Sequence, residues 1–76
     1  MARATHNETV AIPSCEFVDE TFAASIFEWD MQRLYYMQSF NSFPIPIRCG
    51  QMLVVRTADI ARWALNRRYG ITRYSI

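Results

Sequence analysis

Apolar side chains recur with a helical period over residues 20–40, the longest regular stretch of the chain. With about 3.6 residues per turn, one broad arc collects Phe22, Ala23, Ile26, Phe27, Trp29, Leu34, Met37 and Phe40. Asp19 precedes this stretch as a good N-cap, and Glu20 places a negative charge in the first turn, where the helix dipole favours it. The pattern predicts one amphipathic helix from residue 20 to residue 40.

Two extended apolar runs follow at residues 45–49 and 52–56, separated by Gly50 and Gln51. A two-residue connection with glycine first is typical of a hairpin with a type II′ turn. Pro46 cannot donate to a strand ladder, so the first run belongs at a sheet edge. Shorter β-prone runs lie at residues 9–12, stopped by Pro13, and at residues 71–76. Residues 14–19 are expected to form a loop or a ragged entrance to the first helix.

A second helix is predicted to begin after Thr57, which has the residue type of a cap. Its apolar stripe consists of Ile60, Ala61, Ala64 and Leu65. Asp59 lies in the first turn, Arg67 and Arg68 lie in the last, and these charges match the helix dipole. Gly70 is expected at the C′ position, where a left-handed conformation requires no Cβ.

The expected order of elements is strand, helix, strand, strand, helix, strand. Over residues 9–76 this order resembles the βαββαβ pattern of ferredoxin-like domains, which implies an α+β fold with two helices on one face of an antiparallel sheet. If residues 45–56 form an extended loop instead, the alternative is a mostly α-helical fold with at most a short hairpin. Residues 1–7 are interpreted as a polar tail, and residues 8–76 as a single small domain.

Composition narrows the function classes that such a domain can serve. The chain has 76 residues, 51% of them hydrophobic, and only 2 glycines and 3 prolines, which argues against disorder. A core of this size supports only about 3–5 kcal/mol of net stability and leaves little room for a deep catalytic cleft. The longest apolar run, residues 52–55, is far shorter than the roughly 20 residues of a membrane span. With no visible signal peptide, an intracellular, cytoplasmic protein in a reducing compartment is expected.

The sequence contains few residues that could carry out catalysis or bind a metal. Cys15 and Cys49 are interpreted as reduced thiols packed as small hydrophobes, and the single histidine, His6, lies in the N-terminal tail. The acidic group that includes Glu16 is explained by the helix start that follows it. Two glycines do not make a phosphate-binding loop. We therefore expect no enzyme activity, no metal and no cofactor.

Charge is divided unevenly along the chain, and all 8 basic residues are arginine. Residues 1–38 carry two arginines and six carboxylates, a net charge of −4, whereas residues 39–76 carry six arginines and one carboxylate, a net charge of +5. The favoured interpretation is that the two halves pack together and neutralise each other. A basic surface for an acidic protein or for nucleic acid is the alternative.

The second helix supplies the candidate partner-binding surface. On the helical wheel, Trp63 falls about 130° from the centre of the apolar arc, close to Arg67 at i+4. Arg62 and Asn66 flank it, and Arg73 is taken to extend this surface. An exposed Trp–Arg pair is the type of anchor that dominates binding energy, so Trp63→Ala is expected to weaken partner binding and to leave the fold cooperative. The alternative is that Trp63 covers a neighbouring loop.

Three further charged residues fall inside the predicted apolar arcs. Asp30 and Arg33 lie within the arc of the first helix, and Arg68 lies near the centre of the arc of the second. If the two helices lie side by side, these side chains are expected to form a partly buried ion-pair network. The alternative is that they reach solvent at the helix edges.

Together these observations predict a non-enzymatic protein–protein interaction module that docks onto another protein. It would be either an accessory subunit of a larger assembly or a viral-type inhibitor of host machinery. The alternative is a small Arg-rich nucleic-acid-binding protein: residues 57–62 look like the opening of a helix-turn-helix, although only six residues follow Gly70, too few for a recognition helix. A homodimer is a further alternative, because the apolar content is high for so short a chain.

Overall fold

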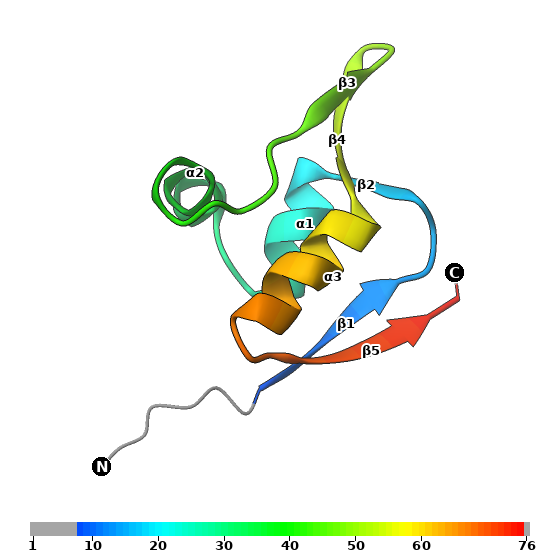
Figure 1. Cartoon of the computed structure of the whole chain (residues 1–76). Helices are drawn as coiled ribbons and strands as arrows, with labels where there is room; N and C mark the ends of the chain where they lie inside the picture. Colours follow the sequence, from blue (N-terminus) through cyan, green and yellow to red (C-terminus); the bar gives the residue numbers. More distant parts are fainter. Residues whose placement is uncertain (1–7, 76) are drawn as a thin grey trace.

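A computed structural model describes residues 8–75, so the predicted tail at residues 1–7 lies outside the described part of the chain. The described residues form a small α+β domain with three helices and five strands in two sheets (Figure 1). In chain order, the elements are β1 (Thr9–Pro13), β2 (Phe17–Asp19), α1 (Glu20–Ile26), α2 (Met31–Phe40), β3 (Ile47–Cys49), β4 (Met52–Arg56), α3 (Thr57–Asn66) and β5 (Gly70–Tyr74).

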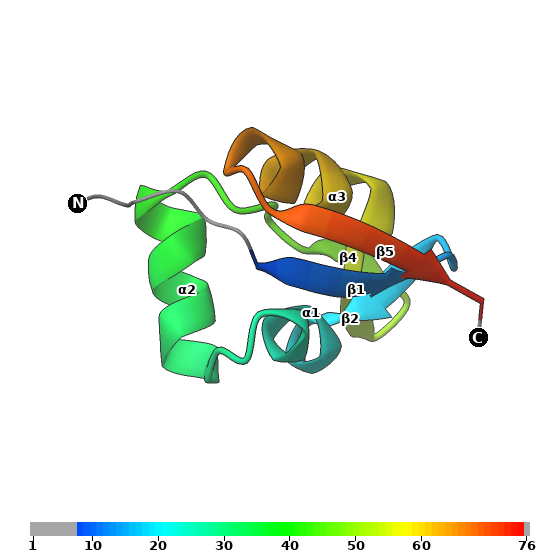
Figure 2. The same cartoon turned by 90° about the horizontal axis from the view of Figure 1, so that it is seen from below.

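The first sheet joins the two ends of the described chain. Strands β1 and β5 pair in parallel, with Thr9 opposite Gly70 and Pro13 opposite Tyr74. A Cβ atom on Gly70 would lie only 2.9 Å from Oγ1 of Thr9, so a larger residue at this position would require the Thr9 side chain to shift. Figure 2 shows the pair lying across one side of the domain, next to α1 and α3.

The second sheet is antiparallel, in the order β2-β4-β3, and it contains the predicted hairpin. Cys49 pairs with Met52 across the two-residue turn, and Gly50 has a φ angle of 65°. Gln51 does not share this positive φ angle, which agrees with the predicted turn type. Strand β3 lies at the sheet edge, as predicted, and it begins directly after Pro46. In Figure 1 this hairpin extends away from the helices.

The ferredoxin-like arrangement is not confirmed, and the prediction of one antiparallel sheet is wrong. Pro13 ends β1, the chain bends over residues 14–16, and a separate strand, β2, pairs with β4 where a loop or helix entrance was predicted. Because β2 occupies that edge of β4, β1 pairs with β5 alone, and in parallel. The mostly helical alternative does not hold either, since residues 47–56 form a true hairpin.

The predicted helix over residues 20–40 is two helices, α1 and α2. Asp19 caps α1 as predicted, with its Oδ1 accepting a hydrogen bond from the Phe22 amide at 2.8 Å. The chain then leaves the helical path at Glu28, which has a φ angle of 62°. Asp30 caps α2 in the same way as Asp19, accepting from the Arg33 amide at 2.8 Å. A residue that the helical wheel placed in the apolar arc is therefore the cap of a second helix.

The ends of α3 also differ from the prediction. Thr57 is the first helical residue and makes no cap hydrogen bond, because its buried hydroxyl donates to the carbonyl of Cys15. At the other end, Arg68 and not Gly70 adopts the left-handed conformation, with a φ angle of 69°. The Arg68 amide donates to Leu65 and the Tyr69 amide to Ala64, which is the hydrogen-bond pattern of a Schellman motif.

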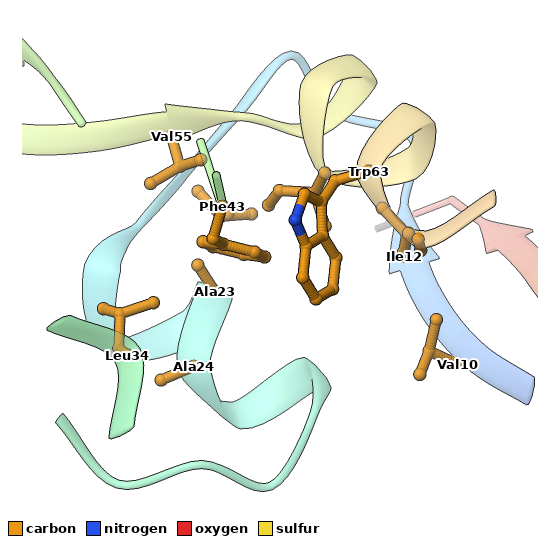
Figure 3. Close-up of a cluster of buried hydrophobic side chains, with 11 residues drawn as sticks. Val10, Ile12, Ala23, Ala24, Leu34, Phe43, Val55 and Trp63 are labelled. Carbon is orange, nitrogen blue, oxygen red and sulfur yellow. The ribbon is translucent and has the colours of Figure 1, made fainter. Parts of the chain in front are cut away.

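Each helix end delivers an aromatic side chain to the same place in the core. The left-handed residues Glu28, Ser42 and Arg68 are followed directly by Trp29, Phe43 and Tyr69. These three rings meet Phe27 and Trp63, with ring centroids between 4.6 and 6.3 Å apart for the contacting pairs. Figure 3 shows Phe43 and Trp63 beside one another, among Val10, Ile12, Ala23, Ala24, Leu34 and Val55. We call these five rings the aromatic cluster.

Candidate functional site

Trp63 is buried and lies in the aromatic cluster, so the prediction that it is exposed is wrong. Only 7% of the residue is accessible to solvent, and its ring packs edge-on against Phe27, Trp29 and Phe43. Its Nε1 donates to the carbonyl of Asn41 at 2.9 Å. The helical wheel assumed that only one face of α3 is buried, the face toward the sheet. The segment after α2 covers a second face of α3, and Trp63 lies on that face. The alternative, that Trp63 covers a neighbouring loop, is confirmed.

The predicted pairing of Trp63 with Arg67 is confirmed, and it has a structural role. The Arg67 guanidinium carbon lies 4.9 Å from the centroid of a Trp63 ring, a cation–π geometry. Its Nη2 donates to the Asn41 carbonyl, which also accepts from Trp63. Asn41 is the C-cap of α2, where the helix dipole is negative. One donor on α3 and one at its C-cap therefore hold the C-terminal end of α2.

An open groove lies between α3 and the segment that connects α2 to β3. Its volume is about 620 Å³, and it is lined by Ser42, Pro44, Ile45, Asp59, Arg62, Trp63, Asn66 and Arg67. Four of the five residues predicted to bind a partner line this groove together. We call it the α3 groove.

Four residues that line the α3 groove were not predicted to bind a partner, and Ile45 is the candidate anchor among them. It is 75% exposed, the most exposed of the large hydrophobic side chains described. It lies between Pro44 and Pro46, and neither proline can donate to a strand ladder that would pull the segment into a sheet. An isoleucine between two prolines was the signal for an apolar side chain held outside the core.

The α3 groove carries a net positive charge. Arg62 Nη1 lies 3.3 Å from Oδ1 of Asp59, but both side chains are well exposed, and such surface pairs contribute only about 0–1 kcal/mol. Asp59 is also 4.0 Å from Arg56, which in turn pairs with Glu16 at 3.1 Å. Arg67 makes no ion pair with a described carboxylate. The groove thus offers two guanidinium groups against one shared carboxylate, which suits an acidic partner.

The favoured interpretation of the uneven charge was that the two halves neutralise each other. Among the described residues, only one ion pair joins the two halves. Arg56 and Glu16 join the halves, whereas the other two pairs join residues within the second half. Arginines without an ion pair to a described carboxylate are Arg33, Arg48, Arg67, Arg68 and Arg73. Much of the basic charge therefore remains available at the surface.

Arg73 does not extend the α3 groove, because its side chain is part of the connection between the two sheets. Its Nη2 donates to the Pro13 carbonyl at 3.1 Å and lies 3.5 Å from Oγ1 of Thr57. Its place on β5 puts it on the first sheet, while the groove is formed by α3 and residues 42–45.

The predicted ion-pair network of Asp30, Arg33 and Arg68 does not form. All three residues are exposed. Asp30 caps α2, the guanidinium of Arg33 lies 5.8 Å from the Tyr36 ring centroid, and Arg68 occupies the turn after α3. The wheel failed here because residues 20–40 do not form one helix, and Arg68 is no longer helical.

Both cysteines are free and exposed, so the prediction that they pack as small hydrophobes is wrong. The Sγ of Cys15 lies 3.3 Å from the Phe17 carbonyl, and Cys49 lies beside the turn of the hairpin. Within residues 8–75, no three histidine, cysteine or acidic side chains gather as a metal site, and no helix is long and apolar enough to cross a bilayer. His6 lies outside the described residues.

Comparisons of the chain with protein-family models, with curated proteins and with solved structures give no significant match.

Proposed function

We propose that this chain is a non-enzymatic module that docks onto another protein through the α3 groove, either as an accessory subunit or as a viral-type inhibitor. The observation that carries the proposal is the combination of exposed Ile45 with Arg62, Asn66 and Arg67 around one groove. Arginine and large apolar side chains around a concave surface are typical of interface anchors, and asparagine adds amide donors and acceptors.

The contacts that hold Trp63 and Arg67 in place in the α3 groove support this proposal. Trp63 is fixed by three edge-on ring contacts and by its hydrogen bond to Asn41. Arg67 is held against the same ring and bound to the same carbonyl. A surface that is ordered before binding loses less conformational entropy when the partner arrives. Net positive charge then favours a partner segment with an apolar residue next to carboxylates.

A capture experiment with matched variants tests the proposal. Ile45→Ser and Leu65→Ser each remove one exposed aliphatic side chain, but only Ile45 lines the α3 groove. The wild-type chain is immobilised, the proteins retained from its native source are identified, and the affinity of each purified partner for the three chains is measured. Loss of an anchor costs about 1.4 kcal/mol or more, so Ile45→Ser is expected to weaken binding at least about tenfold. Equal affinity of the Ile45→Ser and Leu65→Ser chains contradicts the proposal.

Salt dependence separates this function from nucleic-acid binding. The exposed arginines without an ion pair, such as Arg48 and Arg68, are the observation that favours nucleic acid. Binding to a polyanion releases counterions, so its affinity falls steeply between low and moderate salt, by orders of magnitude when many phosphates are contacted. A protein partner anchored by Ile45 keeps most of its affinity over the same range. A steep loss of affinity together with retained nucleic acid favours the alternative.

A further inference from the structure

A second concave surface lies between α2 and the C-terminal end of α3. It has a volume of about 390 Å³ and is lined by Trp29, Arg33, Met37, Trp63, Arg67 and Tyr69. We call it the α2–α3 cleft. It shares Trp63 and Arg67 with the α3 groove, so the two surfaces adjoin. Its walls are aromatic rings and a methionine, and its polar groups are two guanidinium groups and the Tyr69 phenol.

The two arginines of the α2–α3 cleft have no carboxylate partner among residues 8–75. Within this range no acidic residue lines the cleft, and no carboxylate oxygen lies within 4.0 Å of the Arg33 or Arg67 guanidinium. Each guanidinium instead lies near a ring, Arg33 near Tyr36 and Arg67 near Trp63. Two like charges on one concave surface repel each other, and an anion between them removes that cost.

The charges of both arginines also reach Tyr69, which lines the same cleft. Burial raises the pKa of its phenol, and the charge of Glu8 raises it further. The positive charges of Arg33 and Arg67 act in the opposite direction and lower this pKa. Both guanidinium groups therefore act on the Tyr69 hydroxyl, which agrees with their common position in the cleft wall.

Two concave surfaces that share residues with the α2–α3 cleft carry acidic side chains. One includes Glu8 and Glu28 together with Tyr69. The other includes Asp30 together with Arg33. A nucleic-acid strand that continued past the cleft would meet these carboxylates with its phosphates. The charge pattern therefore suits one acidic side chain better than a polyanion.

We infer that the α2–α3 cleft binds a peptide segment of the partner in which a carboxylate side chain is next to an aromatic side chain. The carboxylate would lie between Arg33 and Arg67, and the ring would pack against Met37 and the indole of Trp29. Guanidinium groups bind carboxylates with two donors, and methionine makes favourable contacts with rings. The volume is sufficient for two side chains. The inference rests on the proposed function, since it assumes that the partner is a protein.

Intrinsic fluorescence reports on the α2–α3 cleft directly, because both tryptophans of the chain line it. The probe is the tryptophan-free peptide acetyl-Ser-Glu-Phe-Glu-Ser-amide, titrated into the full chain at low salt. A saturable change in tryptophan fluorescence is expected. The matched peptide with glutamine in place of both glutamates is expected to bind at least about tenfold more weakly, because it lacks the charge-assisted hydrogen bonds. A peptide with alanine in place of phenylalanine is expected to be weaker as well.

Matched charge variants make the test specific to the cleft. Arg33→Gln and Arg48→Gln each remove one exposed arginine without an ion pair, but only Arg33 lines the cleft. Arg33→Gln is expected to weaken binding of the glutamate peptide about tenfold, and Arg48→Gln to leave it unchanged, with the fold of each chain checked by circular dichroism. Equal loss in both variants, equal binding of the glutamine peptide, or tighter binding of a single-stranded oligonucleotide overturns the inference.

The outcome is independent of the test of the α3 groove. Ile45→Ser is expected to retain the glutamate peptide, because Ile45 does not line the cleft. If Ile45→Ser keeps full affinity for captured partners while Arg33→Gln loses the peptide, docking through the α3 groove is contradicted and peptide binding in the cleft is supported. If only the peptide experiments fail, docking through the groove is supported and peptide binding in the cleft is contradicted.

Discussion

The carbonyl oxygen of Asn41 accepts hydrogen bonds from two side chains of α3, the indole of Trp63 and the guanidinium of Arg67. The i+4 spacing on a helix was enough to predict that Trp63 and Arg67 pair with each other. It was not enough to predict their common acceptor, which is 22 residues from Trp63 along the chain. The same side chains that favour a binding surface in the sequence are therefore used to attach α2.

Trp63→Ala is now expected to unfold the domain, in contrast to the expectation from sequence. Removal of a buried tryptophan costs about 3–5 kcal/mol, which is about the whole stability that a domain of this size is expected to have. Trp63→Phe keeps a ring in the aromatic cluster and loses only the indole donor, so a smaller loss is expected. Thermal unfolding followed by circular dichroism measures both. A cooperative transition at the wild-type temperature in Trp63→Ala would show that the cluster is not needed for folding.

Tyr69 makes stability depend on pH at the alkaline end. Burial is the largest cause that raises its pKa in the folded state above the ordinary value of 10.0. Folding therefore favours the protonated phenol, so this contribution to stability is complete below pH 10 and is lost as pH rises through the raised pKa. Wild type is expected to lose stability above pH 10 more steeply than Tyr69→Phe, which has no group to ionise. Urea unfolding over this pH range measures the difference, and equal slopes would contradict it.

At the scale of elements, the helix ends differ most from expectation. The N-caps at Asp19 and Asp30 have the residue types that sequence rules require. The C-terminal ends do not, because Glu28, Ser42 and Arg68 adopt positive φ angles that are ordinarily occupied by glycine. No glycine or proline marks the break after α1, and the apolar period continues through it. That is why residues 20–40 were predicted as one helix.

Arg68→Gly is expected to stabilise the domain by about 0.5–1 kcal/mol. A side chain with a Cβ atom is strained in the left-handed region, and glycine is not. Arg68→Ala is the control, because alanine removes the same charge and keeps the strain. The free energy of unfolding is measured for all three chains in urea. A gain in Arg68→Ala as large as in Arg68→Gly would assign the effect to charge and not to the backbone.

At the scale of the whole molecule, two small sheets are joined through the bend at residues 14–16. Thr57, which is 2% exposed, donates from Oγ1 to the Cys15 carbonyl at 2.5 Å, and its amide donates to Glu16 at 2.9 Å. Arg73 reaches the same region from β5. The hairpin and β5 could be predicted because their signals are local. The connection between the two sheets could not be predicted, because it depends on hydrogen bonds between residues that lie 16–60 positions apart.

Thr57→Val is expected to cost about 1–3 kcal/mol of stability. The substitution keeps the branched shape but removes the hydroxyl of the buried Thr57, so the half-buried Cys15 carbonyl loses this donor. Thr57→Ser keeps the hydroxyl and is expected to lose less. Chemical denaturation of the two variants gives the comparison. If Thr57→Val is as stable as Thr57→Ser, the hydroxyl does not hold the two sheets together.

The pairing of β1 with β5 has a consequence for the order of events during synthesis. Thr9 cannot pair with Gly70 until about sixty further residues have been synthesised. At about 5–20 residues per second, the ribosome needs roughly 3–12 s to make that stretch. The residues of the hairpin and the helices have been synthesised before then, while Val10 and Ile12 still lack β5 beside them. The first strand of this domain to be made is thus among the last to be paired, and the first sheet forms only after β5 has been made.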